Sequence, residues 1–92
     1  MENLQGNMGE VKIYTTPWCP YCVRAKRLLD KKGVDYEDIN VDGQPEVRAK
    51  LREITGRTSV PQIFINGKGI GGCDDLHTLE GIGELDTLLA AS

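Results

Sequence analysis

Hydrophobic and polar residues in the first half of this chain follow two different periods, which predict strands and helices in turn. Residues 11–15 alternate and contain Val, Ile and Tyr, which is typical of a strand, and residues 36–41 form a second short run of this kind. The apolar residues of 22–32 and 45–56 recur at helical spacing instead. The first half of the chain is therefore predicted to run strand, helix, strand, helix.

The second half of the chain predicts a hairpin followed by helical structure. Residues 62–65 are an apolar run, and Asn66-Gly67 is a dipeptide preferred in two-residue type I′ turns, so residues 68–70 are expected to return antiparallel. Asp74 is then expected to cap a helix, because its side chain can accept a hydrogen bond from a free N–H group. Apolar residues between positions 76 and 89 predict one or two closing helices.

These elements predict an α/β fold with a four-stranded mixed sheet flanked by helices. Two strands joined through a helix are parallel with a right-handed crossover, whereas the strands of a hairpin are antiparallel. Ninety-two residues are enough for one hydrophobic core, so we expect one domain over residues 10–92. Residues 1–9 are polar and patternless, and we expect them to be disordered or left over from a protease-site tag.

Two cysteines separated by two residues stand where the first strand gives way to the first helix. Cys19 is placed at the helix start, where free N–H groups and the positive end of the helix dipole favour a thiolate. Because the thiolate is the reactive form, we interpret Cys19 as the nucleophile. Cys22 follows one turn later and is expected to be the more buried, resolving thiol. This spacing beside a strand–helix–strand unit is typical of a thioredoxin-like redox site.

Two other interpretations of the cysteine pair are less favoured. The pair could supply half of a zinc site, but the only further candidate ligands are Cys73 and His77, so no metal site is expected. A purely structural disulfide would close a very small loop and remove little chain entropy. Cys73 itself remains open to two interpretations, a buried hydrophobic residue or a third redox thiol.

Composition and charge narrow the classes of partner. The residues are 39% hydrophobic and 27% charged, as in ordinary globular proteins, and the net charge of −3 provides no basic field for nucleic acid. No apolar run reaches the roughly 18 residues of a membrane span, and the first residues do not form a signal peptide. Three cysteines are an odd number, which favours working thiols. We therefore expect neither nucleic acid nor membrane as a partner, and a cytoplasmic location.

Three separated segments of the chain resemble the dithiol glutaredoxins of the thioredoxin superfamily. They are Cys19-Pro20-Tyr21-Cys22, Ser59-Val60-Pro61 and Gly71-Gly72-Cys73-Asp74-Asp75. The resemblance extends from about residue 11 to residue 89, and it implies a thioredoxin-like fold. It also implies glutathione as co-substrate, no tightly bound cofactor, and a monomer that acts on disulfide-bonded or glutathionylated proteins.

The resemblance further implies where glutathione binds. Pro61 is expected to follow a cis peptide bond, which lets the Val60 backbone pair with the tripeptide as with an added strand. Gly72 lets the backbone approach the ligand, and the helix start at Cys73 and Asp74 is expected to bind the γ-glutamyl group through N–H groups and the Asp74 carboxylate. The other implied contacts are Tyr21 beside the ligand, Arg52 at the glycine carboxylate, and Ser59.

One position departs from the family pattern. Many family members have lysine three residues before the first cysteine, where it contacts the glycine carboxylate, but this chain has Thr16. The resemblance therefore implies that Arg52 or Arg57 supplies that contact.

The resemblance implies a glutathione-dependent oxidoreductase that reduces protein disulfides and glutathione mixed disulfides through Cys19 and Cys22. One alternative is an iron–sulfur carrier in which two chains share a cluster through Cys19 and two glutathiones. Pro20 disfavours it, because cluster-binding relatives usually have Gly or Ser there. A second alternative is a thioredoxin-like donor served by a flavin reductase. The segment 71–75 disfavours that alternative, because such donors usually carry a Trp-containing sequence there.

Overall fold

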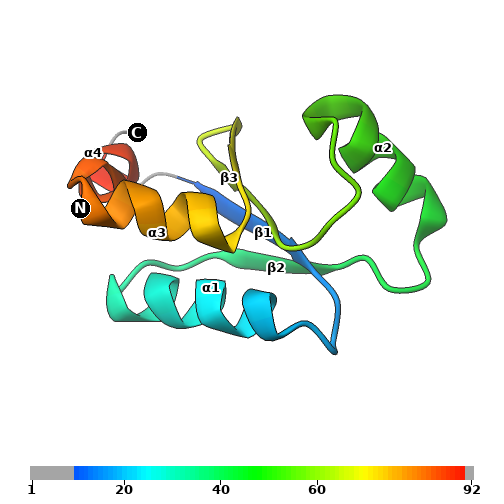
Figure 1. Cartoon of the computed structure of the whole chain (residues 1–92), viewed down its shortest axis with the longest axis horizontal. Coiled ribbons are helices and arrows are strands. Elements are labelled where there is room, and N and C mark those ends of the chain that lie inside the picture. Colours follow the sequence, from blue (N-terminus) through cyan, green and yellow to red (C-terminus); the bar gives the residue numbers. More distant parts are fainter. Residues whose placement is uncertain (1–9, 91–92) are drawn as a thin grey trace, which may run out of the picture.

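A computed structural model describes residues 10–90, and it confirms the predicted order of strands and helices (Figure 1). The elements are β1 (Val11–Thr15), α1 (Pro20–Lys31), β2 (Glu37–Asn40), α2 (Pro45–Thr55), β3 (Gln62–Ile65), β4 (Lys68–Gly71), α3 (Cys73–Gly81) and α4 (Glu84–Ala90). The closing helical region thus forms two helices. The predicted segment 1–9 lies outside the described residues. No helix in the described range is long and apolar enough to cross a membrane.

The four strands form one mixed sheet in the order β2-β1-β3-β4. Strands β1 and β2 are parallel, as predicted for the crossover, and β3 and β4 are antiparallel, as predicted for the hairpin. Strand β3 also runs antiparallel to β1, a pairing that was not predicted. The hairpin turn has φ of 54° at Asn66 and 80° at Gly67. Positive values at both positions are what a type I′ turn requires, and they explain why this dipeptide closes the hairpin.

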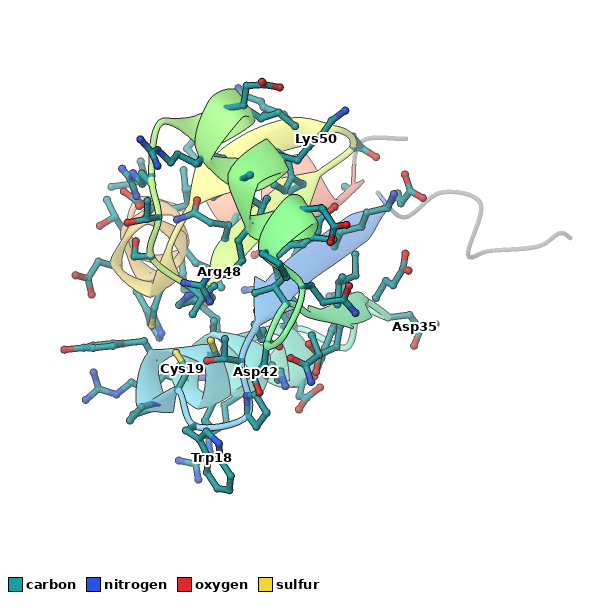
Figure 2. The ribbon with its side chains drawn as sticks, turned by 90° about the vertical axis from the view of Figure 1, so that its right-hand side faces the viewer. Trp18, Cys19, Asp35, Asp42, Arg48 and Lys50 are labelled. Atoms are coloured by element: carbon teal, nitrogen blue, oxygen red, sulfur yellow. The ribbon has the colours of Figure 1, made fainter. Side chains whose placement is uncertain are left out.

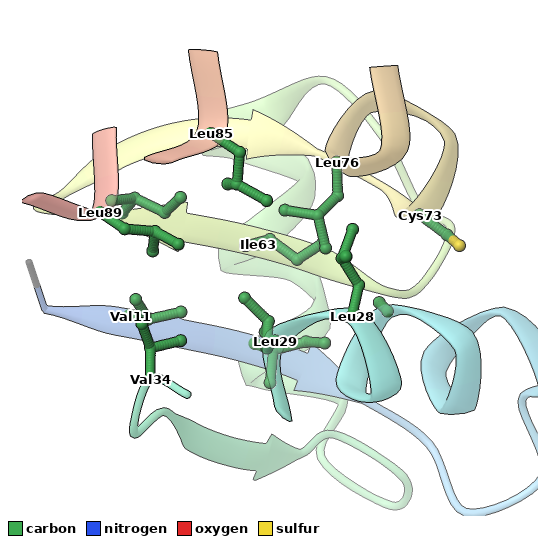
Figure 3. Packing of buried hydrophobic residues seen from close by; sticks show 12 residues of the cluster. Val11, Leu28, Leu29, Val34, Ile63, Cys73, Leu76, Leu85 and Leu89 are labelled. Atoms are coloured by element: carbon green, nitrogen blue, oxygen red, sulfur yellow. The ribbon is translucent and has the colours of Figure 1, made fainter. Parts of the chain in front are cut away.

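The main hydrophobic core lies on one face of the sheet. Successive residues of a strand point to opposite faces, so the buried residues Val11 and Ile13 of β1 share one face. Helices α1, α3 and α4 pack on that face and contribute, among others, Leu29, Leu76 and Leu85, all with no exposed surface (Figure 3). This packing fixes α1 against the sheet, and so it fixes the position of Cys19 and Cys22 at its start.

The other face of the sheet is covered by α2. Tyr14 and Phe64 lie on this face with their rings edge to face, 5.7 Å apart between centroids. Leu51 of α2 is buried, but Ile54 one turn later remains 60% exposed. The α2 side of the domain is therefore less fully packed than the side that carries α1 and α3.

The first helix begins where it was predicted to begin, but the third helix does not. Helix α1 begins at Pro20, because proline fits the first helical position, and Cys19 acts as the N-cap at the predicted helix start. The prediction that Asp74 caps α3 is wrong: Gly72 is the N-cap residue, and the Asp75 carboxylate accepts the Gly72 N–H at 2.9 Å. An acidic residue at the third helical position can satisfy the N-cap N–H in this way, which leaves Asp74 free of that role.

A small polar cluster lies where α1 crosses the edge of the sheet. The Thr15 hydroxyl donates to Asp38 at 2.5 Å, and Lys26 Nζ lies 2.5 Å from the other carboxylate oxygen of Asp38. Burial alone would raise the pKa of Asp38, but the hydrogen bonds from Lys26 and Thr15 outweigh it, so that this pKa lies below its ordinary value of 3.8. The same hydrogen bond to Asp38 is the main reason that the pKa of Lys26 is raised.

Replacing Asp38 with Asn is expected to lower the free energy of unfolding near neutral pH by about 0.5–1 kcal/mol, because the pair is partly exposed to solvent. A lowered pKa stabilises the folded state above the unfolded-state value near 3.8, and this contribution disappears as pH falls through the folded-state value. Urea unfolding of both proteins should therefore show a difference near pH 7 that shrinks near pH 3. Asp42→Asn, at an exposed position, is the control, and a difference independent of pH would contradict this account.

Candidate active site

Cys19 occupies the N-cap position of α1, in extended backbone with φ −109° and ψ 106°. Its sulfur accepts a hydrogen bond from the Cys22 N–H at 3.1 Å and lies 3.7 Å from the carbonyl oxygen of Val60. The side chain is partly exposed, and Figure 2 shows it at the end of the helix that faces the viewer. The sulfur is thus held at the helix start by a first-turn N–H group and stays accessible to substrates.

Cys22 is the more buried cysteine of the pair, as predicted, with 1% of its surface exposed. Burial is the main reason that the pKa of Cys22 is raised to about 12, and the hydrogen bond and charge of Cys19 raise it further. A backbone hydrogen bond from Thr16 and the charge of Lys26 act in the opposite direction. Cys22 is therefore a neutral thiol near neutral pH while Cys19 is free, and the two cysteines differ in reactivity as well as in exposure.

The loop before β3 forms the second wall of the site. The Val60–Pro61 peptide bond is cis, as the family resemblance implied, and Pro61 is buried. The Val60 carbonyl faces Cys19, while its N–H makes no hydrogen bond with any residue of the described range. Ser59 is exposed, and its carbonyl accepts the Gln62 amide at 3.0 Å. The residue whose carbonyl faces the reactive sulfur thus has a free backbone donor, to which an extended peptide could pair.

The start of α3 forms the third wall. Gly72 precedes Cys73, whose side chain is buried at the margin of the core (Figure 3). The pKa of Cys73 is raised, first by burial and then by the charge of Asp74, and the charges of Cys19 and Arg24 also act on it. The Asp74 side chain is exposed and makes no hydrogen bond or ion pair with any described residue.

An ion pair that the sequence did not reveal connects the loop before β3 with the start of α3. Arg57 Nη1 lies 2.9 Å from Asp75 Oδ2, the oxygen that also accepts the Gly72 N–H. These two hydrogen bonds, with Gly72 contributing more, lower the pKa of Asp75. The position of Asp75 three residues after the N-cap could have suggested its capping role, but no local pattern points to Arg57 as its partner. The exposed Arg52 in the last turn of α2, in contrast, has no partner within the described range.

Two aromatic side chains flank Cys19. Tyr21 is about half exposed, and the Arg24 guanidinium lies 5.8 Å from the centre of its ring. Trp18 is 88% exposed and extends away from Cys19 into solvent (Figure 2). Within residues 10–90, no three His, Cys, Asp or Glu side chains are grouped as metal ligands. The geometry suits thiol–disulfide exchange, with an accessible cysteine at the helix start, a buried second thiol and exposed aromatic side chains beside them.

Comparison with known proteins shows similarity to one family, both in sequence and in structure. The glutaredoxin family model matches residues 11–70. A glutaredoxin of Pseudomonas aeruginosa is 60% identical over 84 residues, which cover 91% of this chain and all of that protein. The solution structure of a Brucella melitensis glutaredoxin superposes with a TM-score of 0.83 at 52% identity, covering 92% of each chain. A crystal structure of a buckwheat glutaredoxin–glutathione complex gives a TM-score of 0.85 at 33% identity, covering 96% of this chain and 88% of that one.

Proposed function

The chain belongs to the glutaredoxin family of thiol–disulfide oxidoreductases, and we propose that glutathione is the reductant of its Cys19/Cys22 pair. One observation carries this proposal: the Cys19 sulfur, held by the Cys22 N–H at 3.1 Å, lies 3.7 Å from the carbonyl oxygen of Val60, a residue whose N–H has no partner within residues 10–90. The glutathione complex of the buckwheat relative supports it. The domain, residues 10–92, acts as a monomer on glutathionylated or disulfide-bonded proteins, in a reducing compartment such as the cytoplasm, where thiols persist.

Reduction of a glutathione mixed disulfide needs only Cys19. Its thiolate attacks the glutathione sulfur, which forms a Cys19–glutathione disulfide and releases the other thiol as a thiolate that takes a proton from water. A second glutathione thiolate then attacks the sulfur of the bound glutathione. This step releases the Cys19 thiolate and forms oxidised glutathione, so the mixed disulfide and one free glutathione become the free thiol of the substrate and oxidised glutathione.

Reduction of a protein disulfide also uses Cys22. Cys19 attacks one sulfur of the protein and forms a mixed disulfide, which removes the negative charge that helps to raise the pKa of Cys22. The Cys22 thiol then loses its proton more easily and attacks the Cys19 sulfur. The protein leaves as a dithiol, and two glutathiones reduce the Cys19–Cys22 disulfide in turn. The high pKa of Cys22 in the free enzyme thus keeps it from reacting before Cys19 does.

Glutathione is proposed to lie along the three walls of the site. Its backbone pairs with Val60 as an added strand, beside Tyr21. Its γ-glutamyl carboxylate meets the N–H groups of Cys73 and Asp74, since these first-turn groups have no partner four residues back, and its ammonium meets the exposed Asp74 carboxylate. Gly72 and Ser59 are proposed to lie beside the bound glutathione in the same groove.

The glycine carboxylate of glutathione is assigned to Arg52. The chain has Thr16 in place of the lysine common in the family, so another cation must supply this contact. Arg57 is already engaged by Asp75 at 2.9 Å, whereas Arg52 is exposed and unpaired within residues 10–90. The free guanidinium can form a two-pronged hydrogen bond with a carboxylate without breaking an existing pair.

Replacing Cys22 with Ser is expected to separate the two reactions. Reduction of a glutathione mixed disulfide should stay within about threefold of wild type, because Cys22 takes no part in it, while reduction of a protein disulfide should fall at least about tenfold. Both rates are measured with glutathione, glutathione reductase and NADPH, with hydroxyethyl glutathionyl disulfide and a disulfide-bonded protein as substrates. Loss of both reactions to the same extent would contradict the separate roles of Cys19 and Cys22.

A further inference from the structure

A second cleft, which shares Cys73 and Asp74 with the third wall of the site, runs between α1 and α3. It has a volume of about 590 Å³ and begins at Cys73 and Asp74, at the margin of the active site. The wall formed by α1 carries three cations, Arg24, Arg27 and Lys31. Their spacing of three and four residues places them on one face of the helix, in a row that leads away from Cys19.

The charges of this cleft are not balanced within the domain. Arg27 and Lys31 are exposed and make no hydrogen bond or ion pair with any residue in the range 10–90. Of the two acids in the opposite wall, Glu80 already pairs with Lys32 Nζ at 2.7 Å. Asp74, at the mouth, is the residue proposed to meet the glutathione ammonium. The chain as a whole carries a net charge of −3, so the row of cations gives this cleft a charge opposite in sign to that of the whole protein.

We propose that this cleft binds an acidic segment of the protein substrate while Cys19 attacks its disulfide. The row of cations rises about 4.5 Å from Arg24 to Arg27 and about 6 Å from Arg27 to Lys31, at 1.5 Å per residue. Side chains two residues apart on an extended peptide are separated by about 6.6 Å. Alternate acidic residues of an extended segment therefore match successive cations. The inference rests on the disulfide-exchange chemistry of Cys19 and not on glutathione as the reductant.

A small anion fits this arrangement less well than a peptide does. The cations are spread over about 10 Å of helix and do not converge on one point as they would around a phosphate. Arg24 is also held against the Tyr21 ring, at the end of the row nearest Cys19. A substrate whose disulfide lies at Cys19 would extend past Tyr21 and along the row. The exposed Trp18 on the other side of Cys19 provides apolar contact for the rest of such a substrate.

The test uses the Cys22→Ser protein without glutathione, so that only the attack by Cys19 is observed. The probe is a synthetic peptide whose single cysteine is a mixed disulfide with thionitrobenzoate and is followed by alternate Asp or Glu residues. Cys19 attacks the peptide sulfur, forms a Cys19–peptide disulfide and releases the coloured thionitrobenzoate. The second-order rate constant is compared with that of a peptide in which Asn and Gln replace the acids. The variants are Arg27→Gln/Lys31→Gln and a control of equal charge, Lys50→Gln/Lys68→Gln, at exposed positions outside the cleft.

The acidic peptide should react about threefold to tenfold more slowly with the cleft variant than with its parent, and added salt should remove the difference. The neutral peptide and the control variant should show almost no change. An equal loss with both peptides, an equal loss in the control variant, or no loss at all would overturn the proposal. Because no glutathione is present, these outcomes are independent of whether glutathione is the reductant.

Discussion

Replacing Cys19 with Ser is expected to abolish the reduction of both glutathione mixed disulfides and protein disulfides. The rate should fall by at least about a thousandfold, because a serine hydroxyl is a poor nucleophile near neutral pH and cannot form a disulfide. Cys22 cannot take over the reaction, since it is 1% exposed and its pKa is raised to about 12, mainly by burial. The measurement is the glutathione-coupled consumption of NADPH with each substrate.

The loss of activity in this variant should not reflect unfolding. The Cys19 side chain is partly exposed and lies outside the hydrophobic cluster, so the urea midpoint of Cys19→Ser should lie close to that of wild type. A folded Cys19→Ser protein that still reduces either substrate at more than about a hundredth of the wild-type rate would show that another thiol is the nucleophile. Cys73 would then be the next candidate.

Replacing Gly71 with Ala is expected to cause the largest loss of stability among the variants considered. Gly71 has φ of 114°, which a residue with a side chain rarely adopts. An added Cβ would lie 2.2 Å from Asp75 Oδ2 and 2.7 Å from its Cγ. Asp75 would have to move, which breaks its hydrogen bonds to Gly72 and to Arg57. The backbone strain of about 1–2 kcal/mol and the lost cap of about 1 kcal/mol sum to roughly 2–3 kcal/mol.

Thermal unfolding measures this effect directly. For a domain of this size, 1 kcal/mol corresponds to about 4–8 °C, so the Tm of Gly71→Ala should fall by about 10–20 °C. Gly72→Ala is the matched control for stability, because its φ is −98° and its added Cβ would lie 3.3 Å from the Pro61 carbonyl oxygen, a contact that a small shift relieves. Equal Tm values for the two variants would show that the contact of Asp75 with Gly72 and Arg57 does not hold the start of α3.

Most of the fold could be predicted because its signals are local. The alternation in residues 11–15, the helical spacing in 45–56 and the Asn66-Gly67 turn each depend on neighbouring residues, and the structure confirms each of them. The parallel pairing of the first two strands followed from the intervening helix. The order β2-β1-β3-β4 was not predicted, because it depends on which strands meet through the shared core.

The candidate site likewise has features that local sequence signals predict and features that depend on the tertiary fold. The spacing of Cys19 and Cys22 is a local signal, and their placement at a helix start and their difference in burial followed from it. The ion pair between Arg57 and Asp75 joins residues 18 positions apart, and the hydrogen bond between Thr15 and Asp38 spans 23. Such pairs depend on the tertiary fold, and no periodic pattern in the sequence indicates them. The error at the start of α3 arose because Asp74 and Asp75 are both acceptable capping residues, and only the backbone geometry decides between them.

The central claim is that glutathione reduces the Cys19/Cys22 pair, and the most direct test supplies the wild-type protein with two alternative reductants. In one reaction a disulfide-bonded protein, whose reduction oxidises the Cys19/Cys22 pair, is mixed with glutathione, glutathione reductase and NADPH. In the other, glutathione and its reductase are replaced by thioredoxin reductase. If glutathione is the reductant, turnover should be saturable in the first reaction and almost absent in the second. Turnover with thioredoxin reductase, and none with glutathione, would contradict this claim and would favour a donor served by a flavin reductase.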